Sequence, residues 1–396
     1  MNHNRLSLKA ITTLLAAATL SISLVACDDI VDYNDNYTPA DQMANTGAPE
    51  IKAVYNISDT ALNTPITQAE IGTMVRIEGK NLNNVKSVTF NTVAVDLTEV
   101  YTASTYANVR VPETLSFEHV NKIEYTTDKG TASFDFVVPF PTLTIGSIDN
   151  EFANAGGYVT ISGANFDVYK FGSQSKVLVN GMETTVSDVT KTSMKVHIPE
   201  GTPDNSVISL QWNTSDGIAK TAELPFRPTK NLLYGDFDGV QISKDGSVSV
   251  DVEGDEATST ASSALGHKHL HFTGDFSAWA WNTIDLSCNM IDAGIDGNID
   301  DYVLKFEILN TKDHPLTEAT GLKFNFNWGS EYSWNPDNGA GINTFGNWQT
   351  VTLPLAPMAT KGISEAGKWQ TLRIILQPSA AYTADFCIGN MRIVKK

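Results

Sequence analysis

The fold is decided by two related stretches, IGTMVRIEGKNL at residues 71–82 and AGGYVTISGANF at residues 155–166. In each stretch apolar residues alternate with polar ones up to a glycine, and a Gly-x-Asn turn follows. Alternation with a period of two predicts a strand with one buried face, and glycine with asparagine predicts a tight turn. Because the pattern occurs twice, we expect two copies of one module in succession.

The repeat continues on the C-terminal side of both stretches. Strand–turn–strand patterns, strands ended by proline and hairpins of the Asp-Gly kind recur in the same order, in the pairs 85–96 and 175–186, 108–113 and 194–201, and 126–140 and 213–228. Short alternating segments separated by such turns are typical of a small antiparallel β-sandwich. These turns, with the Asn180-Gly181 hairpin, resemble those of IPT/TIG immunoglobulin-like domains. The resemblance implies one such domain at 48–140 and a second at 141–228.

The N-terminal segment has the pattern of an export signal. Basic residues precede an apolar run within residues 1–26, and LVAC follows at 24–27. This ending resembles a bacterial lipobox, which implies that residues 1–26 are removed and that Cys27 is lipidated. The acidic residues within 27–47 resemble the surface-export signal of Bacteroidetes lipoproteins and predict a flexible tether. A plain secretory peptide with a chance cysteine is the alternative.

The composition narrows the classes of function. The 396 residues carry a formal net charge of −18, and a nucleic-acid-binding protein needs a basic surface that this chain does not offer. Three cysteines are too few for a disulfide framework or a four-cysteine zinc site. Cys288 and Cys387 are predicted to be buried thiols, with a disulfide as the alternative. Six of the seven tryptophans follow residue 229, which places the expected function in the C-terminal part.

Residues 229–396 predict one larger β-sandwich. The opening NLLYGDFDG at 231–239 and the closing ADFCIGNMRIVKK at 384–396 resemble the first and last strands of jelly-roll carbohydrate-binding domains. The apolar strands at 348–357 and 369–378 fit the same fold. The expected fold class is therefore all-β, with two Ig-like (IPT/TIG) sandwiches in tandem followed by a jelly-roll β-sandwich.

Several aromatic residues of this domain are candidate sugar platforms. An aromatic ring can cover the apolar C–H face of a pyranose, while neighbouring amides, carboxylates and amines bind its hydroxyls. Trp279 and Trp281 are two residues apart, so that on a strand they would share a face. Tyr332 and Trp334 lie in a stretch rich in Gly and Asn, which predicts an exposed loop.

The segment LKFNFNW at 322–328 predicts a strand with two different faces. Its apolar side chains, which include the final tryptophan, alternate with Lys323 and Asn325, and we expect this polar face to line a wet groove. Trp348 and Trp369 begin apolar strands and are interpreted as structural. The predicted glycan-binding residues are Trp279, Trp281, Trp328, Tyr332, Trp334, Lys323 and Asn325.

Two polar groupings allow a metal as an alternative. His267, His269 and His271 alternate along one strand, and polar residues on an outer face explain them better than a metal site does. The acidic run from Asp292 to Asp301 could hold a structural calcium ion, although its spacing differs from that of an EF-hand loop. We therefore predict no metal or other cofactor, and structural calcium remains an alternative.

Together these features resemble the surface glycan-binding lipoproteins of Bacteroidetes polysaccharide-utilisation systems. The resemblance implies a non-catalytic protein, lipid-anchored in the outer membrane at the cell surface, that captures a plant or algal glucan (xyloglucan or another β-glucan) beside a TonB-dependent importer. One alternative is a structural or adhesive rod that binds a protein partner. The other is a glycoside hydrolase, which needs two carboxylates about 5–9.5 Å apart across a cleft. No E-x-D-x-x-E cluster of the kind found in jelly-roll glucanases occurs in this domain.

Overall fold

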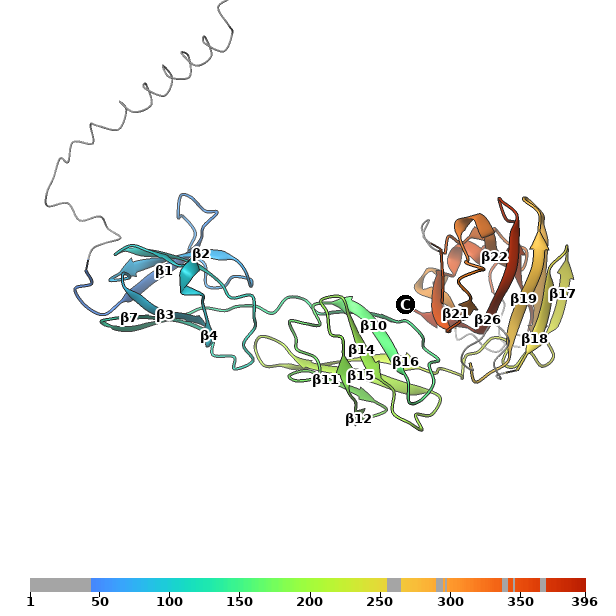
Figure 1. Cartoon of the computed structure of the whole chain (residues 1–396), viewed down its shortest axis with the longest axis horizontal. Helices are drawn as coiled ribbons and strands as arrows, with labels where there is room; N and C mark the ends of the chain where they lie inside the picture. Colours follow the sequence, from blue (N-terminus) through green and yellow to red (C-terminus); the bar gives the residue numbers. More distant parts are fainter. Residues whose placement is uncertain are drawn as a thin grey trace, which may run out of the picture. The chain divides into compact units, whose positions relative to one another are not determined.

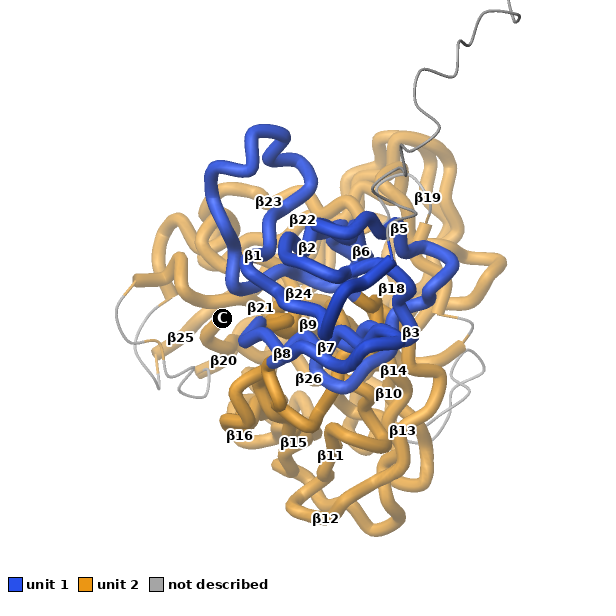
Figure 2. The backbone as a smooth tube through the Cα atoms, turned by 90° about the vertical axis from the view of Figure 1, so that its left-hand side faces the viewer, with its two compact units in different colours: residues 1–111, 122–136 blue, residues 112–121, 137–396 orange. Residues whose placement is uncertain are grey.

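The computed structural model describes residues 44–254, 265–289, 295, 298–336, 341–344, 346–363 and 368–396. These residues form antiparallel strands and four short 3-10 helices, η1 (Leu97–Glu99), η2 (Ile299–Asp301), η3 (Glu318–Thr320) and η4 (Ala356–Met358) (Figure 1). No helix in the described ranges is long and apolar enough to span a membrane. The chain divides into two compact units, residues 1–111 with 122–136 and residues 112–121 with 137–396 (Figure 2).

The first unit contains one small sandwich, the first module. One sheet has the strand order β1 (Glu50–Asn56), β2 (Met74–Lys80), β6 (Tyr106–Arg110) and β5 (Tyr101–Thr102). The other has the order β4 (Val93–Ala94), β3 (Val85–Phe90), β7 (Lys122–Thr127) and β8 (Gly130–Asp135). The alternating apolar residues of β2 and β3 are buried, as their period of two predicts.

The second module repeats this topology within the second unit. One sheet has the strand order β9 (Thr144–Ile148), β10 (Tyr158–Ala164), β14 (Ser193–His197) and β13 (Val186–Ser187). The other has the order β12 (Met182–Glu183), β11 (Lys176–Val179), β15 (Ser206–Asn213) and β16 (Ala219–Phe226). Each strand has its counterpart eight strands earlier, at the same place in its sheet. The duplication and the sandwich fold predicted from the sequence are therefore confirmed, while the exact domain boundaries stay predictions.

The glycine and asparagine of the repeated turn have the same physical role in both modules. A Cβ at Gly163 would overlap the carbonyl oxygen of Thr144, so only glycine lets β9 approach β10 there. Asn165 adopts a left-handed φ of 70°, and its side-chain amide donates a 2.8 Å hydrogen bond to the carbonyl of Thr142. In the first module, Asn81 has a φ of 57° and donates to Ala48 in the same way. This asparagine ties the incoming chain to the end of the second strand.

Two five-stranded antiparallel sheets form the C-terminal domain. The first sheet has the strand order β17 (Gln241–Asp245), β20 (Asn282–Asn289), β25 (Trp369–Leu376), β22 (Leu322–Phe326) and β23 (Tyr332–Ser333). The second sheet has the order β18 (Ser249–Glu253), β19 (His269–Phe276), β26 (Tyr382–Lys395), β21 (Tyr302–Asn310) and β24 (Gln349–Pro354). The core lies between them, and its members include Phe272, Phe306, Phe324, Leu372 and Phe386. This confirms the predicted β-sandwich. Cys288 and Cys387 are buried thiols, as predicted.

An apolar junction joins the second module to the C-terminal domain. Phe152, in the turn after β9, is fully buried. It clusters with apolar residues of the C-terminal domain, namely Leu232, Leu265, Leu309, Trp348 and Cys387. The structural interpretation of Trp348 is thereby confirmed. The second module and the C-terminal domain are thus joined by a packed interface.

A buried ion cluster lies beside Phe152. Arg392 donates to Glu151 of the second module at 2.6 Å, and to Glu307 of its own domain at 2.8 and 3.0 Å. Lys305 also pairs with Glu151, and Thr350 donates to Glu307 at 2.9 Å. Burial alone would raise the pKa of Glu151, but the charges of Arg392 and Lys305 outweigh it and lower this pKa. For Glu307 burial dominates, and its pKa lies above the usual value.

Candidate functional site

The sheet β17-β20-β25-β22-β23 has one face in the core and one outer sheet face. Along β22, Leu322 and Phe324 are buried in the core, so Lys323 between them projects from the opposite face. On β25, Leu372 is buried in the core, and Arg373, which lies opposite Asn325, therefore projects from the same outer sheet face as Lys323. The candidate site is built on this face and at one end of it.

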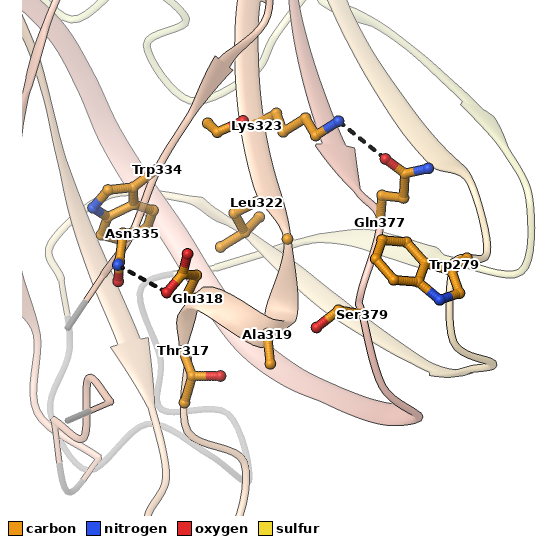
Figure 3. A pocket seen from close by; sticks show the side chains of 12 residues that line it. Trp279, Thr317, Glu318, Ala319, Leu322, Lys323, Trp334, Asn335, Gln377 and Ser379 are labelled. Carbon is orange, nitrogen blue, oxygen red and sulfur yellow. Dashed lines mark hydrogen bonds between the residues drawn. The ribbon is translucent and has the colours of Figure 1, made fainter. Parts of the chain in front are cut away.

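A cavity of about 780 Å³ opens at the end where β22 begins and β25 finishes. Figure 3 shows Trp334 and Trp279 on opposite sides of this cavity, with Lys323 and Gln377 along its upper edge. Lys323 donates to Gln377 at 3.0 Å. Asn335 and Glu318, a second hydrogen-bonded pair, approach to 3.3 Å near Trp334, and the cavity thus combines aromatic walls with groups that can bind sugar hydroxyls. The side chains around it are Trp279, Glu318, Lys323, Trp334, Asn335 and Gln377.

Trp279 is the most exposed tryptophan at the cavity, with 66% of its surface accessible. It lies in the turn between β19 and β20, so the expected strand with Trp279 and Trp281 on one face is wrong. Its φ of 65° is left-handed, which is rare for a bulky residue. Its backbone N–H donates to the carbonyl of Pro378 at 2.6 Å. Strain of this kind, at about 1–3 kcal/mol, persists only where the surroundings enforce it. The fold thus holds this indole out from the surface.

Trp334 is only 8% exposed, which contradicts the expected solvent-exposed loop position. Its ring meets Phe306 edge-on at 5.8 Å and lies 6.2 Å from Phe324. The backbone N–H of Trp334 donates to the carbonyl of Leu322 at 2.9 Å. This bond ties the chain after β23 to β22 and directs the indole into the core. Tyr332 is half-buried and packs against the same core. Trp334 therefore offers an edge to the cavity rather than an open platform.

The two polar residues predicted on β22 differ in their surroundings. Lys323 is partly exposed, donates to Glu331 at 3.1 Å, and has its ammonium 5.4 Å from the ring centre of Trp281. Asn325, expected in a wet groove, is instead buried on β22, where it lies opposite Arg373 of β25. Its Oδ1 has no hydrogen-bond partner within the described part of the chain. Trp281 is exposed beside Lys323.

Trp369 departs from its sequence-based interpretation, and Trp328, a predicted glycan-binding residue, departs from the strand face that alternation assigned to it. β22 ends at Phe326, and the left-handed φ values of Asn327 (52°) and Trp328 (55°) reverse the chain. Trp328 therefore leaves the core face that alternation assigned to it and is 52% exposed. Trp369, interpreted as structural, is 51% exposed. The sequence did hold a signal for this exposure. Trp369 alternates in step with Arg373 along the strand, and not with the core residue Leu372.

The three histidines are not equivalent. His271 lies between Glu253 at 2.7 Å and Asp385 at 2.8 Å. His269 projects from the same face of β19, away from the core residue Leu270, but is buried against Trp348. Burial lowers the pKa of His269. Burial would also lower the pKa of His271, but its two carboxylate partners raise it. No group of three or more His, Cys, Asp or Glu among the described residues could hold a metal ion. Asp292 and Asp296 lie outside those residues.

Comparison with known families supports the interpretation of both halves of the second unit. Residues 143–226 match the family model of the IPT/TIG domain. Residues 226–395 match the model described as the surface glycan-binding protein B xyloglucan binding domain. The C-terminal domain is thus similar to the domain that this model describes. No curated protein matches the chain at a significant level.

Solved surface glycan-binding proteins B are similar to the chain along most of its length. PbSGBP-B from Prevotella bryantii is 18% identical, with a TM-score of 0.58 over 89% of this chain and 99% of that one. SGBP-B from a complex xyloglucan utilization locus in Bacteroides uniformis is 20% identical, with a TM-score of 0.45 over 88% of this chain and 100% of that one. At such identities the similarity to PbSGBP-B establishes the fold, and site residues must be argued from this chain itself.

Proposed function

We propose that this protein is a non-catalytic glycan-binding protein whose C-terminal domain captures a polysaccharide. The observation that carries the proposal is Trp279, an exposed indole held by a strained turn at the mouth of a cavity with polar walls. A pyranose can stack on this ring while Lys323, Gln377 and Asn335 hydrogen-bond to its hydroxyls. Because stacking leaves many hydroxyls in water, each sugar adds modest affinity, and a polymer with several contacts binds best.

The proposed ligand class is a β-glucan, with xyloglucan as the first member to test. The family matched by residues 226–395 is described as xyloglucan-binding, which supports this choice. That family is one of binding domains, and the proposal assigns this chain no reaction. Trp281, Trp328 and Tyr332 are proposed as additional contacts, and Trp334 as a wall of the cavity.

The cellular setting is proposed from the sequence. Residues 1–26 and Cys27 lie outside the described residues, and the lipobox pattern at 24–27 supports lipidation of Cys27. A lipid at Cys27 followed by the acidic tether would place the glycan-binding domain outside the outer membrane. A TonB-dependent importer is the proposed partner that receives the polysaccharide.

The test uses residues 28–396 as one chain and xyloglucan or mixed-linkage β-glucan as probes. Affinity electrophoresis and calorimetry should detect binding to at least one polymer. Trp279→Gly should weaken binding about 10–100-fold, since burying an aromatic side chain is worth about 1.5–3 kcal/mol. Glycine accepts the left-handed turn at this position, so the substitution adds no backbone strain. Tyr158→Ala removes an exposed aromatic from the second module and is the matched control.

Retention of full affinity by Trp279→Gly would remove this residue from the site. If the parent chain binds neither polymer, the proposed function is wrong for these ligands. Thermal unfolding of each variant, measured alongside, shows whether a lost affinity follows from lost structure.

A further inference from the structure

We propose that Trp328, Trp369 and Arg373 form a second sugar subsite on the outer sheet face, so that one neutral polysaccharide chain spans this face from that subsite to the Trp279 cavity. The inference rests on the proposed function and extends it. It adds Trp369 and Arg373 to the binding surface, and it specifies the charge class of the ligand.

Strand β25 places both ends of this surface on one line. Trp369 and Arg373 project from the same face of β25, because they are an even number of positions apart. Gln377, which lines the cavity, follows directly after the last residue of the strand. Gln377 is eight positions after Trp369, which corresponds to about 26 Å of extended strand. Thr371 and Ile375 between them are buried, so the larger side chains of this face cover the strand between the two ends. The surface is long enough for several sugar rings.

The turn that carries Trp328 is firmly held. The Asn327 side chain donates to Gly362 at 3.0 Å and to Gln370 at 2.7 Å, and it accepts from the N–H of Thr371 at 3.1 Å. These bonds fix two successive left-handed residues and leave the indole of Trp328 half exposed. Trp279 at the other end shows the same combination of a left-handed backbone and an exposed indole. A core-packing role explains neither, because both rings face solvent.

Arg373 links the indole of Trp328 to the polar part of the face. Its guanidinium lies 5.7 Å from the ring centre of Trp328 and makes two 2.7 Å hydrogen bonds to Asp285. This bidentate pair fixes the guanidinium plane, so little side-chain freedom is lost when a ligand binds. Arginine has five N–H donors, and two of them are used here, which leaves donors for sugar hydroxyls.

The charges on this face select a neutral ligand. The cations Arg373 and Lys323 are already paired, with Asp285 and Glu331 respectively. Asp245 adds a further negative charge that acts on Arg373. A polysaccharide with carboxylate or sulfate groups would therefore meet repulsion from these carboxylates, whereas hydroxyls can share the paired groups as hydrogen-bond partners.

The test compares the chain 28–396 with its Trp328→Gly/Trp369→Ala double variant. The probes are polymeric xyloglucan, a xyloglucan oligosaccharide of about the length of one subsite, and polygalacturonate as an anionic polymer. The parent should prefer the polymer to the oligosaccharide and should not bind polygalacturonate. The double variant should lose about tenfold or more in affinity for the polymer and less than twofold for the oligosaccharide, because the Trp279 cavity is intact.

Three results would overturn the inference. They are unchanged polymer affinity in the double variant, an equal loss for polymer and oligosaccharide, and tight binding of polygalacturonate by the parent. Tyr158→Ala is the control, and thermal unfolding verifies that each variant is folded. Arg373→Lys provides a second variant. It keeps the positive charge but loses the planar guanidinium that makes two hydrogen bonds to Asp285, and it should also weaken polymer binding. If the parent binds no glycan at all, the proposed function fails instead of the second subsite.

Discussion

Arg392→Met is expected to destabilise the second unit severely, because Arg392 connects carboxylates of two domains. Arg392 is completely buried, and the residue from the second module that it binds, Glu151, is 241 positions away in sequence. The substitution leaves Glu151 with Lys305 as its remaining cation. It leaves the fully buried Glu307 with Thr350 as its described side-chain partner.

The magnitude follows from the burial of these charges. Removing one member of a buried ion pair costs about 3–5 kcal/mol, because a charge is left in the interior without compensation. At about 2–4 °C per kcal/mol for a unit of this size, the Tm should fall by roughly 6–20 °C. Arg110→Met in the first module breaks an exposed pair with Glu99 and should cost about 1 kcal/mol or less.

Calorimetry and urea unfolding of residues 28–396 measure these effects. Intrinsic fluorescence follows the unfolding of the tryptophan-rich C-terminal domain, and Trp348, buried beside Phe152 at the junction, contributes to this signal. Adding Glu307→Gln to Arg392→Met should restore part of the lost stability by removing the uncompensated charge. A Tm within 2 °C of the parent for Arg392→Met would refute the reasoning. A double variant no more stable than the single one would attribute the loss to packing instead of charge.

Two further predictions concern the second module and the histidines. Gly163→Ala should destabilise the second module by about 1–3 kcal/mol, since the added methyl would overlap the backbone of Thr144; unfolding monitored by urea titration tests this, and an unchanged midpoint would contradict it. His271→Gln should cost more stability at pH 5 than at pH 8. Glu253 and Asp385 raise the pKa of His271 in the folded protein, so its contribution is present below about pH 6.5 and is lost as the pH rises through the folded pKa. An equal loss of Tm at both pH values would rule out this linkage.

Much of the fold was predictable because its signals are local. The period-two alternation, the Gly-x-Asn turn and their repetition indicated two related sandwiches, and the structure confirms the same strand order in both. Gly163 and Asn165 act within a few strands of their own position, through the approach of β9 and the bond to Thr142. Such short-range geometry leaves a direct trace in the order of residues.

The candidate site was less predictable, because exposure depends on where a strand ends and on what packs over it. Alternation along 322–328 assigned Trp328, a predicted sugar contact, to the core face of the strand, but two left-handed residues end the alternation. Trp334, in a segment that looked like an open loop, is drawn into the core by its bond to Leu322. Trp369 looked structural but projects from the same outer sheet face as Arg373.

By itself, the sequence determined the all-β class, the duplicated modules and the concentration of tryptophans in the C-terminal domain. Only the tertiary structure decided which of those tryptophans face solvent, and only it brought Glu151 to Arg392. The physical reason is that strand periodicity is set by neighbouring residues along the chain. Burial and ion pairing are set instead by side chains that meet after the sheets have stacked, and partners far apart in the sequence leave no local pattern.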